Sequence, residues 1–210
     1  MEGPHLLNAA VAAGVGIETI FSLEGAELPD CDAEVVIVTD GVLDRLAPTD
    51  HPRGPIAVFR PEPRRPTAPH AMVLWGLSDP GNAGTLIRTA AAFGVDIFVT
   101  PGTVDLWSPK VLRAASGAHF SVGFGKATQV SDLTSMGYRV IAAVATGGAW
   151  PDEVRVGDHG ALVIGSEAHG LPSEVAAAAD IRVSIPMPGG VESFNAGVAG
   201  SILAYTLFSG

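Results

Sequence analysis

The sequence predicts an α/β protein with a mostly parallel sheet covered by helices on both faces, preceded by a small α/β unit. After residue 70, continuous runs of Val, Ile and Leu alternate with stretches of helical periodicity, which is typical of parallel strands buried on both sides. The 210 residues are 47% hydrophobic and 16% charged, so the chain has ample apolar material for a core. This composition excludes a disordered chain and a mini-protein that depends on disulfides.

The N-terminal part of the chain predicts the small α/β unit from its pattern of apolar residues. We expect its two helices at 4–13 and 42–46, and its three strands at 17–23, 35–39 and 56–59.

A segment rich in proline and arginine, RPEPRRPTAP, follows the last of these strands. Proline cannot continue a helix or a central strand, so this segment predicts an extended linker. We therefore expect an accessory domain over 1–60, a linker over 61–70 and a second domain over 71–210.

Apolar runs in the second domain predict the strands of its parallel sheet. The runs are AMVLWGL, VDIFVT, YRVIAAVA, ALVIG and IRVSIP. The helices expected between and after them lie at 82–93, 109–116, 129–136, 172–179 and 194–208. Ligands of such sheets bind at the carboxyl ends of the strands, so the loops after the strands are the places to look for a site.

The single cysteine and the ends of the chain bear on compartment and membrane association. Cys31 cannot form an intrachain disulfide, and no Cys/His group has metal-ligand spacing. The chain has Glu2 and no Lys or Arg before Arg45, whereas a secretory signal needs a basic start. The uncharged residues 193–210 include Asn195 and three glycines, which favours a buried helix over a membrane span. We expect a cytoplasmic protein without a membrane anchor or a bound metal.

Acidic residues outnumber basic ones, 22 against 12, for a formal net charge of minus 10. This balance disfavours a protein that binds nucleic acid over its whole surface. Residues 60–113, however, carry six basic and four acidic residues. Lys110 and Arg113 share a predicted helix face there, and Arg64 and Arg65 lie in the linker. Any attraction for a polyanion must therefore come from local charge.

The first unusual loop, LSDPGNAGTLIRTAAAFG, leads from a strand into a helix. Asp79 or Asn82 can cap that helix, with Pro80 in its first turn. Capping does not explain Arg88, which lies within about 120° of Asn82 around the helix axis. Arg88 is either a solvated surface residue or part of a site.

The second loop, ALVIGSEAHGLP, ends a buried strand between Gly165 and Gly170. Glycines at both ends indicate backbone conformations or close approaches that a side chain would block. Glu167 is either a solvated carboxylate or a hydrogen-bond acceptor for a ligand, and His169 has no assigned role. The loop lacks the middle glycine of a dinucleotide fingerprint, which disfavours NAD binding.

The third loop, IPMPGGVESFNAGVAGSILAY, leads into a helix expected to begin near Ser193. Glu192, Ser193 and Asn195 crowd the helix start, where capping is the simplest explanation. Along the helix, small residues recur at Ala196, Gly200 and Ala204. This stripe predicts a tight interface, because it allows another backbone to approach closely.

Together these loops resemble motifs of the SpoU (TrmH-type) RNA ribose 2′-O-methyltransferases of the SPOUT superfamily. The first motif, N-x-G-x-x-x-R-T-A-x-x-F-G, is matched by Asn82, Gly84, Arg88, Thr89, Ala90, Phe93 and Gly94. The second, G-x-E-x-x-G-L, is matched by Gly165, Glu167, Gly170 and Leu171. The third, I-P-M-x-G-x-x-x-S-L-N, is matched by Ile185, Pro186, Met187, Gly189, Ser193 and Asn195, with Phe194 in place of leucine. The segment SPKVLRAASGA from Ser108 is a further match, and the resemblance covers about 71–210.

The resemblance implies a C-terminal trefoil knot, a homodimer formed through this region and an S-adenosylmethionine pocket. The residues that it places in the pocket are Gly165, Ile185, Met187 and Phe194, with Thr100 and Gly102 as a further wall. It also implies methyl transfer to a ribose 2′-OH of rRNA or tRNA, with S-adenosylhomocysteine as the other product. In that reaction Arg88 stabilises the developing alkoxide, while Asn82, Glu167, Ser193 and Asn195 position the ribose or hold Arg88.

Residues 2–60 resemble the family's accessory RNA-binding domain, of the ribosomal L30e type. Relatives carry an arginine-rich segment upstream of the EG at positions 2 and 3, so a truncated accessory domain is one expectation. The residues expected to contact RNA are Lys110, Arg113, Arg64 and Arg65.

Two other functions remain open at this point. One is a non-catalytic, ribosome-associated RNA-binding protein that retains the knotted fold, which the acidic balance and short N-terminus would suit. The other is a nucleotide-dependent oxidoreductase on an open parallel sheet, which has no glycine fingerprint to support it.

Overall fold

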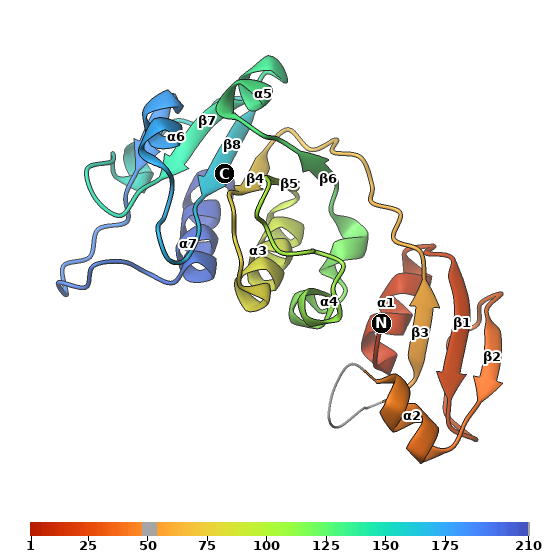
Figure 1. Cartoon of the computed structure of the whole chain (residues 1–210). Helices are drawn as coiled ribbons and strands as arrows, with labels where there is room; N and C mark the ends of the chain where they lie inside the picture. Colours follow the sequence, from red (N-terminus) through yellow and green to blue (C-terminus); the bar gives the residue numbers. More distant parts are fainter. Residues whose placement is uncertain (48–53, 210) are drawn as a thin grey trace.

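The structure is a computed structural model that describes residues 1–47 and 54–209. Its strands form two sheets, a small one near the N-terminus and a larger one made of the strands in the rest of the chain (Figure 1). An extended segment connects β3 with β4 and runs between the two sheets.

The N-terminal sheet has three strands in the order β2-β1-β3. Its elements are α1 (Pro4–Ala12), β1 (Ile17–Ser22), β2 (Glu34–Ile37), α2 (Asp40–Leu46) and β3 (Ile56–Phe59). β1 pairs parallel with β2 and antiparallel with β3. Pro4, whose missing N–H is harmless in a first turn, starts α1, which buries Leu6, Leu7 and Ala10. Every element predicted for this unit is present, although α2 begins two residues earlier than expected.

The larger sheet has six strands, and all of its neighbouring pairs are parallel. The strands are β4 (Ala71–Leu74), β5 (Asp96–Val99), β6 (Phe124–Lys126), β7 (Arg139–Ala143), β8 (Gly160–Ile164) and β9 (Ile181–Val183). Their order is β6-β5-β4-β8-β7-β9, so β4 and β8 lie side by side at the centre. The prediction of a mostly parallel sheet is confirmed, but the short edge strand β6 was not predicted.

Helices cover both faces of this sheet. They are α3 (Pro80–Phe93), α4 (Pro109–Ala115), α5 (Val130–Ser135), α6 (Ser173–Ala178) and α7 (Ala196–Phe208), with short 3₁₀ turns at η1 (Ala118–Ser121) and η2 (Pro151–Glu153). Met72 of β4 packs in one core with Leu86 of α3 and Leu203 of α7. Its neighbour Val73 points to the opposite face and packs with Leu133 of α5.

The segment 61–70 is extended, as predicted, and it is attached to the β6 edge of the larger sheet. Arg64 forms a parallel bridge with Gly123, and its carbonyl accepts a hydrogen bond of 2.8 Å from the Phe124 N–H. The buried carboxylate of Asp96 accepts backbone hydrogen bonds from both sides, at 2.6 Å from Ala68 and 2.8 Å from Gly123. This segment therefore has a defined path across the molecule.

Two element ends differ from the prediction. β4 stops at Leu74 because Gly76 takes a left-handed conformation, with φ at 62°. α7 begins at Ala196, three residues after Ser193, because the Asn195 side chain caps it by accepting from the Val198 N–H. Over the described part of the chain, no helix is both long and apolar enough to cross a bilayer.

Candidate active site

A cavity of about 600 Å³ lies where β7 and β8 end and the chain approaches α7. Its lining includes many of the predicted site residues, namely Gly165, Glu167, Ile185, Met187, Ser193, Phe194 and Asn195. The volume is in the range of pockets that hold small organic ligands, and its walls combine apolar side chains with polar loop backbone. The second and third loops of the sequence therefore form one site.

Glu167 connects this cavity to the start of α3. Its Oε2 accepts hydrogen bonds from the backbone N–H of Ser78 at 3.2 Å and from the Ser78 hydroxyl at 3.1 Å. Its Oε1 accepts from the backbone N–H of Asp79 at 3.1 Å and from the Asn82 side-chain amide at 3.0 Å. A single carboxylate thus fixes the loop after β8 against the loop after β4.

These hydrogen bonds keep Glu167 ionised. Partial burial opposes ionisation, but hydrogen bonds from the Asn82 side chain and from the backbone of Glu167, Ser78 and Asp79 outweigh it and lower the pKa to about 2. A negative charge held by donors is a fixed structural element and not a general base at neutral pH.

Replacing Glu167 with glutamine should destabilise the protein above pH 5 and have little effect near pH 2. A depressed pKa in the folded state stabilises the protein above the unfolded value of 4.5, and this contribution is lost as the pH falls toward 2. We expect a loss of about 1 kcal/mol at neutral pH, because water partly screens this exposed side chain. Urea titrations of both proteins from pH 3 to 7 measure the difference. A difference in the free energy of unfolding that stays constant over this pH range would contradict the lowered pKa of Glu167.

Asn82 and Asn195 lie on either side of the contact between α3 and α7. A Cβ atom on Gly197 would stand 3.1 Å from Asn82 Oδ1 and 3.2 Å from Asn195 Oδ1, so both side chains border this glycine. Further along, the hydroxyls of Thr89 and Ser201 form a hydrogen bond of 2.7 Å between the two helices.

The small-residue stripe of α7 lies in this contact. A Cβ atom on Gly200 would come within 2.4 Å of Leu86, a side chain of α3. The tight interface predicted from the stripe therefore exists within the chain, against α3. The opposite face of α7 exposes Val198, Ile202 and Tyr205.

Arg88 is on the exposed side of α3, one residue before Thr89. Among residues 1–47 and 54–209, its side chain has no hydrogen-bond or ion-pair partner, so the structure does not show it held by Asn82 or Glu167. Its guanidinium is free to meet a substrate.

Thr100 and Gly102 lie at the end of β5, and neither lines the cavity formed by the described residues. Thr100 is buried and has a structural role: its hydroxyl accepts from the Gly76 N–H at 2.9 Å and donates to the Leu74 carbonyl at 3.3 Å. The cavity wall in their place comes from Ala143, the last residue of β7, and from Val144 and Ala145 after it.

The residues predicted to contact RNA are all exposed. Lys110 and Arg113 lie on α4, and Arg64 and Arg65 lie in the segment between the two sheets. Ser78, which no motif predicted, donates hydrogen bonds to Glu167 from both its hydroxyl and its N–H. Its only signal was its place directly before Asp79 in the first loop.

Comparison with known proteins identifies the family. The model of the SpoU rRNA methylase family matches residues 69–205. This chain belongs to the SpoU rRNA methylase family. The family match covers the whole of the six-stranded sheet and most of α7.

Two curated relatives and one solved structure show how far the similarity to other SpoU-type proteins extends. A 23S rRNA (guanosine(2553)-2′-O)-methyltransferase of Bacillus subtilis is 29% identical over 99% of this chain and 87% of its own length. An uncharacterized tRNA/rRNA methyltransferase of Synechocystis is 33% identical over 98% and 81% of the respective chains. The AdoMet-bound rRNA methyltransferase from Sinorhizobium meliloti has a TM-score of 0.81 and is 26% identical over 98% of this chain and 85% of its own.

Proposed function

We propose that this SpoU family member transfers a methyl group from S-adenosylmethionine to a ribose 2′-hydroxyl of rRNA or tRNA. The observation that carries the proposal is the 600 Å³ cavity, which is lined by the second and third SpoU motifs and tied by Glu167 to the first. Support comes from the Bacillus subtilis relative, named for 2′-O-methylation of 23S rRNA, and from the AdoMet-bound Sinorhizobium meliloti structure.

The cavity fits S-adenosylmethionine in size and chemistry. Ile185, Met187 and Phe194 offer apolar surface for the adenosine, and Gly165 keeps the backbone close at the end of β8. When bound, the cofactor supplies a methyl group on a sulfonium that is activated for displacement.

Arg88 and the residues around Glu167 have different roles in methyl transfer. Arginine does not lose its proton near neutral pH, so the proton of the 2′-hydroxyl leaves to water, while Arg88 stabilises the alkoxide charge that develops on the acceptor oxygen and orients the neighbouring phosphate. Asn82 and Glu167 hold the start of α3 in place. Ser193 and Asn195 line the cavity where the ribose approaches.

The test of methyl transfer is incubation of the protein with methyl-labelled S-adenosylmethionine and RNA from cells that lack its gene. Label in the RNA supports the proposed methyltransferase activity. Tight RNA binding without label would support the non-catalytic, ribosome-associated protein instead.

For the domains we propose an accessory RNA-binding domain over 1–60, a linker over 61–70 and a catalytic domain over 71–210. The sheet order β2-β1-β3 with α1 supports a small α/β module, which we assign to the L30e type. We propose a cytoplasmic location, where rRNA and tRNA are found.

Charge reversal at Lys110 and Arg113 should weaken RNA binding about tenfold or more and leave S-adenosylmethionine affinity unchanged. Both side chains project from α4 into solvent, so two phosphate contacts are lost without loss of packing. The plot of log K against log salt concentration has a negative slope, and its magnitude should decrease by about two because two phosphate contacts are lost. Filter binding at several salt concentrations measures this, with charge reversal of the exposed Arg155 and Arg182 as the matched control. An unchanged affinity for RNA would show that Lys110 and Arg113 do not contact its phosphates.

We further propose that the C-terminal segment forms a trefoil knot and that two chains dimerise through α7. The segment from Ile185 to Asn195 shares one cavity with the loop after β8, which supports the threaded path. On the outer face of α7, Val198, Ile202 and Tyr205 recur at helical spacing with 45%, 36% and 65% exposure. An apolar face of this kind is typical of an interface.

Replacing Ile202 and Tyr205 with glutamate should convert a dimer into a monomer, because each subunit would bury two uncompensated charges in the interface. Sedimentation at micromolar concentration measures the change. Val35→Glu is the matched control, since Val35 is also exposed, at 47%, but lies on β2 of the N-terminal sheet. A wild-type protein that is monomeric under these conditions would contradict the proposal.

A further inference from the structure

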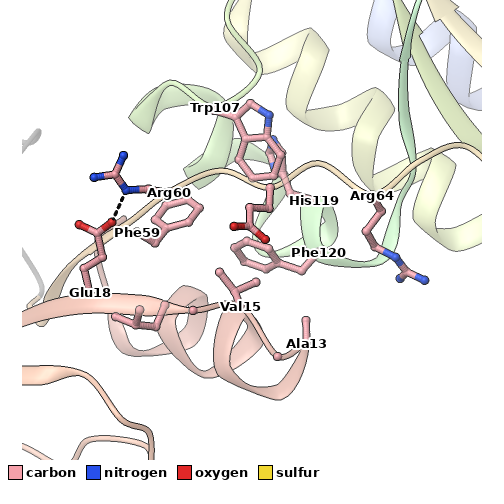
Figure 2. Close-up of a pocket in the computed structure, with 13 residues that line it drawn as sticks. Ala13, Val15, Glu18, Phe59, Arg60, Arg64, Trp107, His119 and Phe120 are labelled. Carbon is pink, nitrogen blue, oxygen red and sulfur yellow. Dashed lines mark hydrogen bonds and ion pairs between the residues drawn. The ribbon is translucent and has the colours of Figure 1, made fainter.

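A second cavity, of about 390 Å³, lies between the N-terminal sheet and the part of the chain that holds Trp107 and η1 (Figure 2). One side is formed by the chain after α1, by β1 and by Phe59 at the end of β3. The other side is formed by Trp107 and by His119 and Phe120 of η1. The two cavities have no lining residue in common within the described chain, so this cavity is separate from the candidate active site.

Aromatic rings form its apolar wall. The ring centroids of Phe59 lie 6.1 Å from Trp107 and 6.2 Å from Phe120, both in edge-on arrangements. Behind them, Leu6 and Leu112 belong to a core that joins the two parts of the chain. The aromatic surface is therefore held in place before any ligand arrives.

Arginines flank this wall on both sides in Figure 2. Arg60 is held by Glu18, with 2.7 Å between Nε and Oε1. Arg64 is exposed, and no side chain in the described part of the molecule pairs with it. An anionic group that approaches the cavity from this side meets a free guanidinium.

The other polar groups of the lining are hydrogen-bond acceptors. His119 is 1% exposed, and burial lowers its pKa to about 4, even though its bond to Leu106 favours the charged form. Its Nε2 lies 2.7 Å from the Leu106 carbonyl, which can only accept, so the neutral ring has its proton on Nε2. Nδ1 is then an acceptor without a donor among the described residues. The exposed Glu62 adds a carboxylate that has no partner in the same part of the chain.

We infer that this cavity binds one unstacked base of the RNA, at a nucleotide other than the one that is methylated. The base stacks on the ring cluster of Phe59, Trp107 and Phe120, which accepts any base because each has a π-face. Glu62 accepts a hydrogen bond from an exocyclic amine, which favours guanine, adenine and cytosine over uracil. Arg64 contacts the phosphate.

This inference rests on the proposed function, because it takes RNA as the substrate. The location supports RNA over a free metabolite. Trp107 lies two residues before α4, which carries Lys110 and Arg113, and Arg64 is followed by Arg65, so further basic residues are close in the chain to both sides of the lining. The lining combines residues of the N-terminal unit with Trp107, His119 and Phe120 of the second one, and a bound base would therefore fix the RNA against both parts of the protein.

Trp107 fluorescence tests the site directly. The chain has three tryptophans, so a Trp75→Phe/Trp150→Phe protein reports from Trp107 alone. The probes are GMP, AMP, CMP and UMP, with ribose 5-phosphate as the base-free control and saturating S-adenosylhomocysteine to fill the other cavity. We expect the first three nucleotides to quench Trp107 at lower concentration than UMP, and ribose 5-phosphate not to quench. Calorimetry on the unsubstituted protein repeats the titration without the tryptophan changes.

Two variants connect the signal to the proposed contacts. Arg64→Ala should weaken nucleotide binding about three- to tenfold through loss of a charge-assisted bond, and Glu62→Ala, which removes the acceptor, should remove the preference over UMP. Arg182→Ala, an exposed arginine on the far edge strand β9, is the matched control and should have no effect. Absence of quenching at millimolar nucleotide, or quenching that neither variant alters, would overturn the inference.

RNA methylation assays separate this inference from the proposed function. A raised KM for RNA in Arg64→Ala supports both. An unchanged KM in Arg64→Ala and Glu62→Ala, with methyl transfer intact, overturns the base site and leaves the proposed function standing. Quenching of Trp107 by nucleotides in a protein that methylates no RNA overturns the proposed function and the link to its substrate.

Discussion

Replacing Arg88 with alanine should lower the rate of methyl transfer by at least about a hundredfold, the usual cost of removing one group that stabilises developing charge. The affinity for S-adenosylmethionine should change little, because Arg88 does not line the 600 Å³ cavity. The fold should also be unaffected. The side chain is exposed and makes no hydrogen bond within the described chain, so its removal leaves no packing defect or unpaired partner. Single-turnover kinetics with saturating cofactor measure the rate.

Two further variants sharpen this experiment. Arg88→Lys keeps the charge but loses the planar fork, so we expect an intermediate rate if the guanidinium orients a phosphate as well as stabilising charge. Arg182→Ala removes an exposed arginine on β9 and should behave as wild type. Turnover by Arg88→Ala within tenfold of wild type would reject Arg88 as the group that stabilises the alkoxide.

Replacing Gly165 with alanine should weaken cofactor binding substantially. The added Cβ atom would lie 2.2 Å from the carbonyl carbon of Gly170 and 2.4 Å from the backbone nitrogen of Leu171. Both are backbone atoms, so the clash cannot be relieved by a change of side-chain rotamer. The loop after β8 must therefore move, together with Glu167 and the cavity wall that it forms. Such overpacking costs about 1–3 kcal/mol, which corresponds to roughly a five- to 150-fold loss of affinity. Calorimetric titration with S-adenosylhomocysteine measures it.

Gly189→Ala is the matched control for this substitution. Gly189 belongs to the third motif, but among the described residues nothing lies within 4 Å of the place where its Cβ would be. We expect cofactor affinity close to wild type. Equal affinities in the two alanine variants would show that the close approach at Gly165 is unrelated to the cofactor pocket.

Local sequence signals were sufficient for most of the larger sheet and failed where an element is short. Runs such as ALVIG predict buried strands without knowledge of their partners, and β8 indeed pairs with β4 on one side and β7 on the other. β6 has only three residues with a glycine in the middle, and it exists because Phe124 and Lys126 pair with β5. Pairing with a strand that is distant in the sequence determines such a short strand, and the local pattern of residues does not show this pairing.

The same limit applies to the site. The motifs located Asn82 and Glu167, but their hydrogen bond joins residues 85 positions apart, and only the adjacency of β4 and β8 brings them together. Asp96 appears in the sequence as one more surface charge, whereas it is buried and accepts backbone hydrogen bonds that attach the segment 61–70. The cavity beside Trp107 could not be foreseen either, because it depends on how the two sheets are placed.

The most direct test of the methyltransferase assignment is the identity of the methylated nucleoside. RNA labelled by the protein with methyl-labelled S-adenosylmethionine is digested to nucleosides and analysed by chromatography and mass spectrometry. The proposed function predicts that the label is on the ribose, as a 2′-O-methylnucleoside, and that Arg88→Ala lowers the rate of labelling by at least about a hundredfold. Label on a base, or none in the presence of bound cofactor and RNA, would contradict it.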